Sequence, residues 1–154
     1  MVKRTLATIG YEGASMESFL RALKEAKVEL LVDIRAVASS RRPGFSKNAL
    51  AANLAEAGID YLQLRGLGTP SDGRAAARAR QYAELERIYA EHLKTPDAQD
   101  QLAALVEVVR GGRKACLMCF EADHRHCHRR MVAEAVGAQI AITVTNLVGD
   151  PDDE

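Results

Sequence analysis

Residues 30–35 read Leu-Leu-Val-Asp-Ile-Arg, a nearly continuous apolar run that ends at an arginine. Consecutive apolar residues are typical of a strand that is covered on both faces, as in a parallel sheet. Asp33 and Arg35 are two positions apart on this strand, so their side chains share a face. The run therefore predicts a buried parallel strand whose end carries a carboxylate and a guanidinium.

Strand and helix patterns alternate on both sides of this run. Residues 5–9 form an apolar strand pattern, and Ser15 can cap the helix that follows. Apolar residues recur at helical spacing in that helix: Met16, Phe19, Leu20 and Leu23. After residue 35, a helix containing Leu50 and Leu54 ends at Gly58, before a third strand at residues 59–64. The order is thus β, α, β, α, β.

The second half of the chain continues the alternation. Residues 85–93 and 96–109 have the spacing of two amphipathic helices. A fourth strand at 114–120, a helix around 131–136 and a last strand at 139–147 follow. The last strand alternates apolar and polar residues, which is typical of a sheet edge.

Strands separated by helices favour an α/β domain with a mainly parallel, doubly wound sheet, Rossmann-like or flavodoxin-like, of about five strands. The chain has 154 residues, of which 47% are hydrophobic, a size and composition that suit one packed domain. We assign residues 1–149 to this domain and the acidic residues 150–154 to a solvated tail.

The charges exclude strong long-range attraction to nucleic acid or membranes, because 21 basic and 21 acidic residues cancel. The first residues lead directly into a strand pattern, and no apolar run is long enough to span a membrane. Three cysteines stand close together in sequence, unlike the framework of a secreted protein, which indicates thiols and not structural disulfides. We expect a cytoplasmic protein.

In a doubly wound sheet, ligands bind beyond the carboxyl ends of the strands, where loops and helix N-termini meet. The loops expected there are rich in polar and reactive residues. The candidate site residues are Tyr11, Gly13, Asp33, Arg35, Ser40, Arg41, Glu121, Cys127, His128 and Arg129.

Motifs in these loops resemble those of the domain of unknown function 488 (DUF488) family. They stand in the same order as in that family and run through nearly the whole chain. They are Thr8-Ile9-Gly10, Asp33-Ile34-Arg35, Ser40-Arg41, Phe45-Ser46-Lys47, Leu67-Gly68, Cys119-Phe120-Glu121 and Cys127-His128-Arg129. The family is named for lacking an established reaction, so the resemblance implies no particular activity.

Cys127 precedes a helix pattern and should lie near the positive end of the helix dipole. That position, with histidines nearby in sequence, could lower the pKa of the thiol and make Cys127 a nucleophile. The alternative is that Cys127 packs in the core beside Met131, because cysteine is among the most buried residue types.

A metal site is the third alternative, because Cys116 and Cys119 have the spacing of zinc ligands. Residues three apart on a strand point to opposite faces, so these two cannot chelate one ion together unless the strand is broken there. A smaller set remains, formed by Cys119, Cys127 and one of His124, His126 or His128. We expect no metal and no cofactor, since residues 10–13 also lack the spacing of dinucleotide and P-loop motifs.

Anion binding is the function that the residue types favour most. Arg35, Arg41 and Arg129 are suited to phosphate or carboxylate groups, which guanidinium forks bind bidentately. Asp33 and Glu121 could transfer protons beside them, or Asp33 and Arg35 could form a structural ion pair that holds the following loop.

Two functional hypotheses follow. In the first, the chain is an enzyme for a small phosphorylated or nucleotide-like molecule, with Cys127, Asp33 and Glu121 as catalytic residues. In the second, it is a non-catalytic module that binds a metabolite or a nucleic acid. For nucleic acid, a basic patch with an aromatic residue is formed by Arg35, Arg41, Arg42, Lys47 and Phe45. Three further arginines, Arg74, Arg78 and Arg80, are predicted to lie on a charged helix face.

Overall fold

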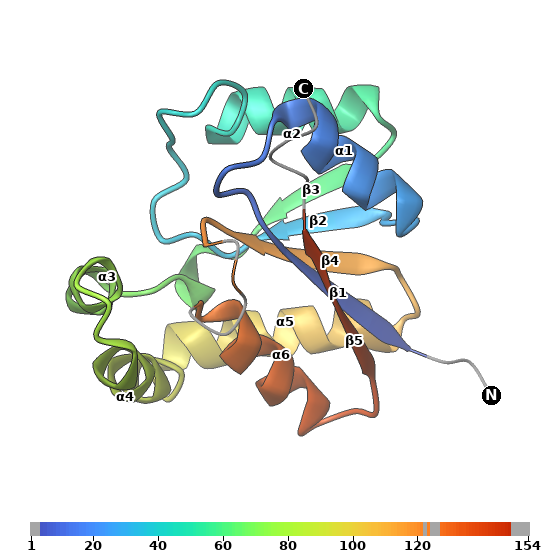
Figure 1. The fold of residues 1–154 in the computed structure, drawn as a ribbon. Helices are drawn as coiled ribbons and strands as arrows, with labels where there is room; N and C mark the ends of the chain where they lie inside the picture. Colours follow the sequence, from blue (N-terminus) through green and yellow to red (C-terminus); the bar gives the residue numbers. More distant parts are fainter. Residues whose placement is uncertain (1–3, 122, 124–126, 149–154) are drawn as a thin grey trace.

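The computed structural model describes residues 4–121, 123 and 127–148 (Figure 1). Its strands are β1 (Thr5–Gly10), β2 (Leu30–Asp33), β3 (Asp60–Gln63), β4 (Ala115–Cys119) and β5 (Thr143–Val148). Its α-helices are α1 (Met16–Glu25), α2 (Lys47–Glu56), α3 (Ser71–Arg78), α4 (Tyr82–His92), α5 (Pro96–Arg110) and α6 (Arg129–Gly137). A short 3-10 helix, η1, spans Arg65–Leu67.

The strands form a single parallel sheet in the order β3-β2-β4-β1-β5. In the register of the three inner strands, Asp33 of β2 pairs with Met118 of β4, and Gly10 of β1 pairs with Cys119. The carboxyl ends of β1, β2 and β4 therefore lie together at one edge. The predicted α/β class and the parallel sheet of five strands are confirmed.

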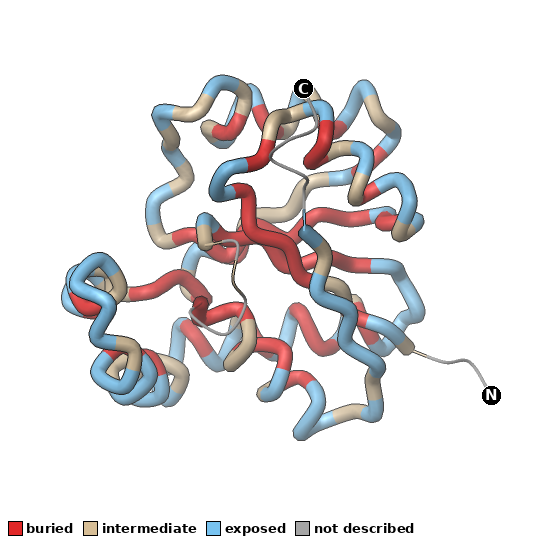
Figure 2. The backbone as a smooth tube through the Cα atoms, viewed as in Figure 1, coloured by how far each residue is buried: buried red, intermediate tan, exposed pale blue. Residues whose placement is uncertain are grey.

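Helices cover both faces of the sheet. Figure 1 shows α1 and α2 on one face, and α5 and α6 on the other. The residues of β2 are all buried, and they alternate between two apolar cores: Leu31 packs toward α1 and α2, and Val32 toward α5 and α6. The buried segments in Figure 2 gather in the centre of the sheet, whereas β5 is largely exposed. The buried strand at residue 30 and the edge position of the last strand are as predicted. The last strand begins at Thr143 and not at residue 139, and it is exposed on both faces and not on one.

The helix boundaries follow from the capping residues. Ser15 Oγ accepts a hydrogen bond from Ser18 N at 3.0 Å at the start of α1. Thr95 caps α5, whose first residue is Pro96, where a missing N–H costs nothing. Gly58 follows α2 with a φ of +77°, a conformation that glycine adopts without steric penalty. The predicted ends of these helices are confirmed.

The segment between β3 and α5 is more broken than the sequence pattern indicates. α3 and α4 are separate helices, and Arg80 lies between them with a φ of +58°. No helix among the described residues is long and apolar enough to cross a membrane. The acidic tail at 150–154 lies outside the described residues.

The topology changes direction between β1 and β4. β1 and β4 are neighbours, yet the helices that follow them, α1 and α6, lie on opposite faces of the sheet. The loops after β1 and β4 stay hydrogen-bonded to each other as far as Glu12 N and Phe120 O, which are 2.7 Å apart. The switch in helix side between these strands marks the place where doubly wound sheets have their crevice.

Gly68 provides a test of how closely the loops at this edge pack. A Cβ added at Gly68 would lie 2.3 Å from the backbone nitrogen of Ala36, which follows β2. We expect Gly68→Ala to lower the free energy of unfolding by about 1–3 kcal/mol in urea denaturation, because the backbone must move to accommodate the methyl group. The control is Gly111→Ala, where the added Cβ has no neighbour closer than 3.5 Å. Equal stability of the two variants would contradict the close approach.

Candidate functional site

A cleft of about 680 Å³ opens beyond the carboxyl ends of β1 and β4. Glu12 lines it from the loop after β1, and Glu121 and Asp123 from the loop after β4. The α3 region contributes a row of residues to the same cleft: Thr69, Arg74, Ala77, Arg78 and Arg80. A smaller hollow of about 140 Å³ shares several of these residues and adds Tyr11, Arg35 and Cys119.

Asp33 and Arg35 form a buried, bidentate ion pair at the end of β2. Arg35 Nε donates to Asp33 Oδ1 at 2.9 Å, and Arg35 Nη2 donates to Asp33 Oδ2 at 2.8 Å. Asp33 is fully buried and Arg35 is 6% exposed. Burial disfavours the charge on Arg35, but the hydrogen bonds and charge of Asp33 outweigh it, so the pKa of Arg35 is raised.

This ion pair also organises the surrounding loops. Tyr61 of β3 donates a hydrogen bond to Asp33 Oδ2 at 2.5 Å, and burial together with this bond raises the pKa of Tyr61. Arg35 Nη1 donates to the backbone oxygen of Phe45 at 2.8 Å and to Tyr11 Oη at 3.3 Å. Arg35 thus ties the loop after β2 to the loop after β1. The geometry matches the structural ion pair that the sequence left as an alternative.

Tyr11 and Phe45 belong to the core around this pair. Their rings stack with centroids 4.6 Å apart, and Tyr11 is only 3% and Phe45 only 1% exposed. Tyr11 still borders the smaller hollow. Phe45, in contrast, has no exposed ring face on which a nucleic-acid base could stack.

Three candidate residues lie in the loops after β1 and β2, away from the cleft. Gly13 is exposed and has a φ of +77° in the turn after β1. Ser40 Oγ accepts a hydrogen bond from Arg42 N at 3.1 Å within the loop after β2. Arg41 has an exposed side chain in the same loop. None of these described residues borders the cleft or the smaller hollow.

Arg129 is fully buried at the first position of α6. Its Nη1 donates to Cys119 Sγ at 3.0 Å and to the backbone oxygen of Glu121. Burial lowers the pKa of Arg129. The guanidinium of Arg129 is therefore buried next to the cleft and does not border it. Glu121 does border the cleft, and burial raises the pKa of the Glu121 carboxyl group.

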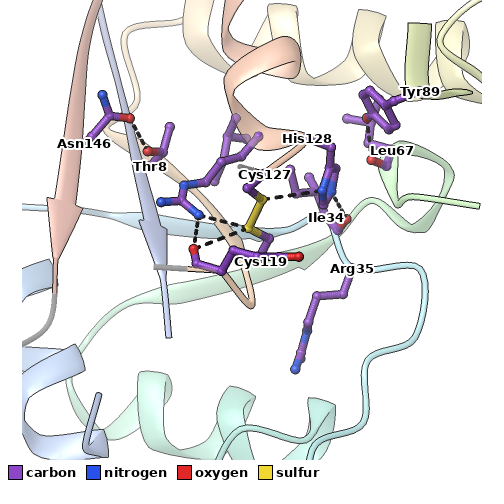
Figure 3. Close-up of a disulfide and its surroundings, with 12 residues drawn as sticks. Thr8, Ile34, Arg35, Leu67, Tyr89, Cys119, Cys127, His128 and Asn146 are labelled. Atoms are coloured by element: carbon purple, nitrogen blue, oxygen red, sulfur yellow. Dashed lines mark hydrogen bonds between the residues drawn. A yellow bond between two sulfur atoms is a disulfide. The ribbon is translucent and has the colours of Figure 1, made fainter. Parts of the chain in front are cut away.

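Cys119 and Cys127 form a disulfide, which corrects the expectation of three thiols (Figure 3). The sequence pattern fails here because it does not show that the loop after β4 returns to the same side of the sheet. Cys116 is a free thiol on the opposite face, packed against the core of α1 and α2, as strand alternation predicts. In the disulfide state, Cys127 has no thiol with which to attack a substrate.

His128 lies beside the disulfide and is 7% exposed. Its Nδ1 is 3.5 Å from Cys127 Sγ, and its Nε2 is 2.8 Å from the backbone oxygen of Ile34. Burial lowers the pKa of His128 to about 4, so the ring is neutral at pH 7. Figure 3 shows this ring next to the disulfide, with Arg35 extending away from both. His124 and His126 lie outside the described residues.

The arginines that border the cleft are not among the candidate residues predicted from the sequence. Arg74, Arg78 and Arg80 were predicted on a charged helix face, and the structure has them in the cleft wall. Arg74 is half-buried, and its Nη1 donates to the backbone oxygen of Thr69 at 2.9 Å. The signal available in the sequence was their density, three arginines within residues 74–80.

The fold and site define a single α/β domain with a parallel sheet of five strands and, at the carboxyl edge, a cleft whose lining includes several charged residues. The model of the family described as "Domain of unknown function DUF488" matches residues 15–136, most of the chain. The chain therefore belongs to the DUF488 family, as its motifs indicated. No curated protein and no solved structure matches the chain significantly.

The buried ion pair leads to a stability prediction. We expect Asp33→Asn to lower the free energy of unfolding by about 3 kcal/mol or more, because Arg35 would keep its buried charge without the opposing carboxylate. The matched control is Glu84→Gln, which removes an exposed partner of Arg87 on α4 and should change stability by less than about 1 kcal/mol. Urea denaturation measures both variants, and an equal effect would argue against a structural role for Asp33.

Proposed function

We propose that this chain binds a small anionic molecule, phosphorylated or nucleotide-like, in the cleft beyond β1 and β4. The observation that carries the proposal is the arginine-rich wall formed by Arg74, Arg78 and Arg80. Guanidinium groups bind phosphate and carboxylate through paired N–H donors, and a concave site strengthens this attraction by excluding water.

The charges around the cleft are separated by their position in the fold. The arginines come from α3 and the turn after it, whereas Glu12, Glu121 and Asp123 come from the loops after β1 and β4. A ligand with an anionic end and a hydrogen-bond-donating end matches this polarity. Such a ligand would bind with its anionic group toward α3.

Arg74 is the central residue of the proposal. It borders both the cleft and the smaller hollow, and its bond to Thr69 O restricts the side chain. A guanidinium has five N–H donors, and this bond uses one of them. A restricted side chain loses less conformational entropy when it binds a ligand.

Binding without catalysis fits the described contacts better than the enzyme hypothesis. Asp33 is occupied by Arg35 and Tyr61, and Cys127 is bonded to Cys119. Arg35 is engaged in the same way, so the arginines of α3 replace Arg35, Arg41 and Arg129 as the proposed anion contacts. The neutral net charge and the buried Phe45 favour a small ligand over a nucleic acid.

Calorimetric titration with inorganic phosphate and adenosine monophosphate tests the proposal. We expect Arg74→Ala to weaken binding by about tenfold or more, since a hydrogen bond to a charged group contributes about 1.5–3 kcal/mol. Binding should also weaken as salt is added, because partly exposed charges are screened.

Arg87→Ala is the matched control, because Arg87 is an arginine of α4 that pairs with exposed Glu84. It should leave affinity unchanged. If neither probe binds, or if Arg87→Ala weakens binding as much as Arg74→Ala, the proposal is wrong.

A further inference from the structure

Three groups with metal-binding chemistry meet beside the smaller hollow. The Sγ atoms of Cys119 and Cys127 and a ring nitrogen of His128 all lie within 4.8 Å of one another. Cys119 ends β4, while Cys127 and His128 immediately precede α6. A zinc ion holds sulfur at about 2.3 Å and nitrogen at about 2.0–2.1 Å. Its ligand atoms are therefore about 3–4 Å apart. His128 Nδ1 is already 3.5 Å from Cys127 Sγ, whereas the two bonded sulfurs must separate to this distance once the disulfide is reduced.

The hydrogen bond of His128 orients it as a ligand. Its Nε2 lies 2.8 Å from the backbone oxygen of Ile34, and a carbonyl oxygen can only accept a hydrogen bond. Nε2 therefore carries the proton, and Nδ1 presents its lone pair on the side of Cys127 Sγ, 3.5 Å away. Metal-binding histidines are commonly held in this way, with the second nitrogen donating to a backbone carbonyl.

Arg129 lies against one of the two sulfur ligands. Its Nη1 donates to Cys119 Sγ at 3.0 Å, within the buried wall. A cation next to a cysteine stabilises the thiolate, which is the form that binds metals. Two thiolates also neutralise the charge of a divalent ion, so the ion adds no unbalanced charge beyond that of Arg129.

We propose that Cys119, Cys127 and His128 together bind a thiophilic divalent metal ion, of which Zn²⁺ is the representative, when the disulfide is reduced. Cys119 and His128 border the smaller hollow, so a fourth coordination position faces this hollow and the adjoining cleft. Three protein ligands with one open position are typical of zinc sites that bind an exchangeable ligand. This inference goes beyond the proposed anion binding and does not depend on it.

The disulfide state converts to the metal-bound state in two steps. Two thiol molecules reduce the Cys119–Cys127 disulfide, giving two protein thiols and one disulfide of the reductant. The divalent ion then binds both sulfurs, and two protons are released. The oxidised chain cannot bind in this way, because the two sulfurs are bonded to each other.

Titration of the reduced full-length chain with Co²⁺ under anaerobic conditions tests this inference. Tetrahedral cobalt bound to thiolates has visible d–d bands and a sulfur-to-cobalt charge-transfer band in the near ultraviolet. We expect one Co²⁺ per chain, displacement by Zn²⁺, and no such spectrum with the oxidised chain. Cys127→Ser and His128→Gln should each weaken cobalt binding by at least about tenfold.

Cys116→Ala is the control, because this thiol lies on the opposite face of the sheet. Absence of the charge-transfer band, or an equal loss in Cys116→Ala, would overturn the inference. If the ligand variants do not fold, X-ray absorption of the zinc-loaded natural chain decides the question. Two sulfur and at least one nitrogen neighbour support the site, and a shell of oxygen and nitrogen alone refutes it. The titration contains no anionic ligand, so its outcome is independent of anion binding.

Discussion

The ion pair between Asp33 and Arg35 is the interaction on which the carboxyl edge of the sheet depends. Two charges are buried where a central strand ends, and a buried charge is tolerated only when it is paired and hydrogen-bonded. Arg35 meets this requirement by reaching Asp33, Tyr11 and the backbone of Phe45, so three segments of the chain must converge on it. Because the buried charges of Asp33 and Arg35 need these partners, they fix the positions of the loops that carry them.

The need to pair buried charges also distinguishes the residues that stabilise the fold from those that are available to a ligand. Arg35 and Arg129 hydrogen-bond to internal groups, and neither of them borders the cleft. Arg74 and Glu121 border the cleft itself, and the anion-binding proposal relies on this difference. The disulfide between Cys119 and Cys127 lies at the smaller hollow, which Cys119 borders. Under the metal-binding proposal, reduction of this disulfide changes the chemistry of the site.

Much of the fold was predictable from the sequence, because burial and helix capping leave local patterns. The apolar run at residue 30 predicted a strand covered on both faces, and Ser15 and Gly58 marked helix ends. The contacts within the site were harder to predict from the sequence, because they join residues far apart in the chain. Whether Arg35 faces Asp33 or a ligand depends on where Phe45 and Tyr61 lie, and the cleft position of Arg74 depends on the break before α4. The pairing of Cys119 with Cys127 likewise depends on the path of a loop that has no regular pattern.

The most direct test of this account is a crystal structure of the chain with phosphate bound. The account predicts a phosphate within hydrogen-bonding distance of Arg74 in the cleft, with Arg35 still paired to Asp33. A phosphate bound to an Arg35 that has left Asp33, or bound at Arg41 outside the cleft, would contradict it.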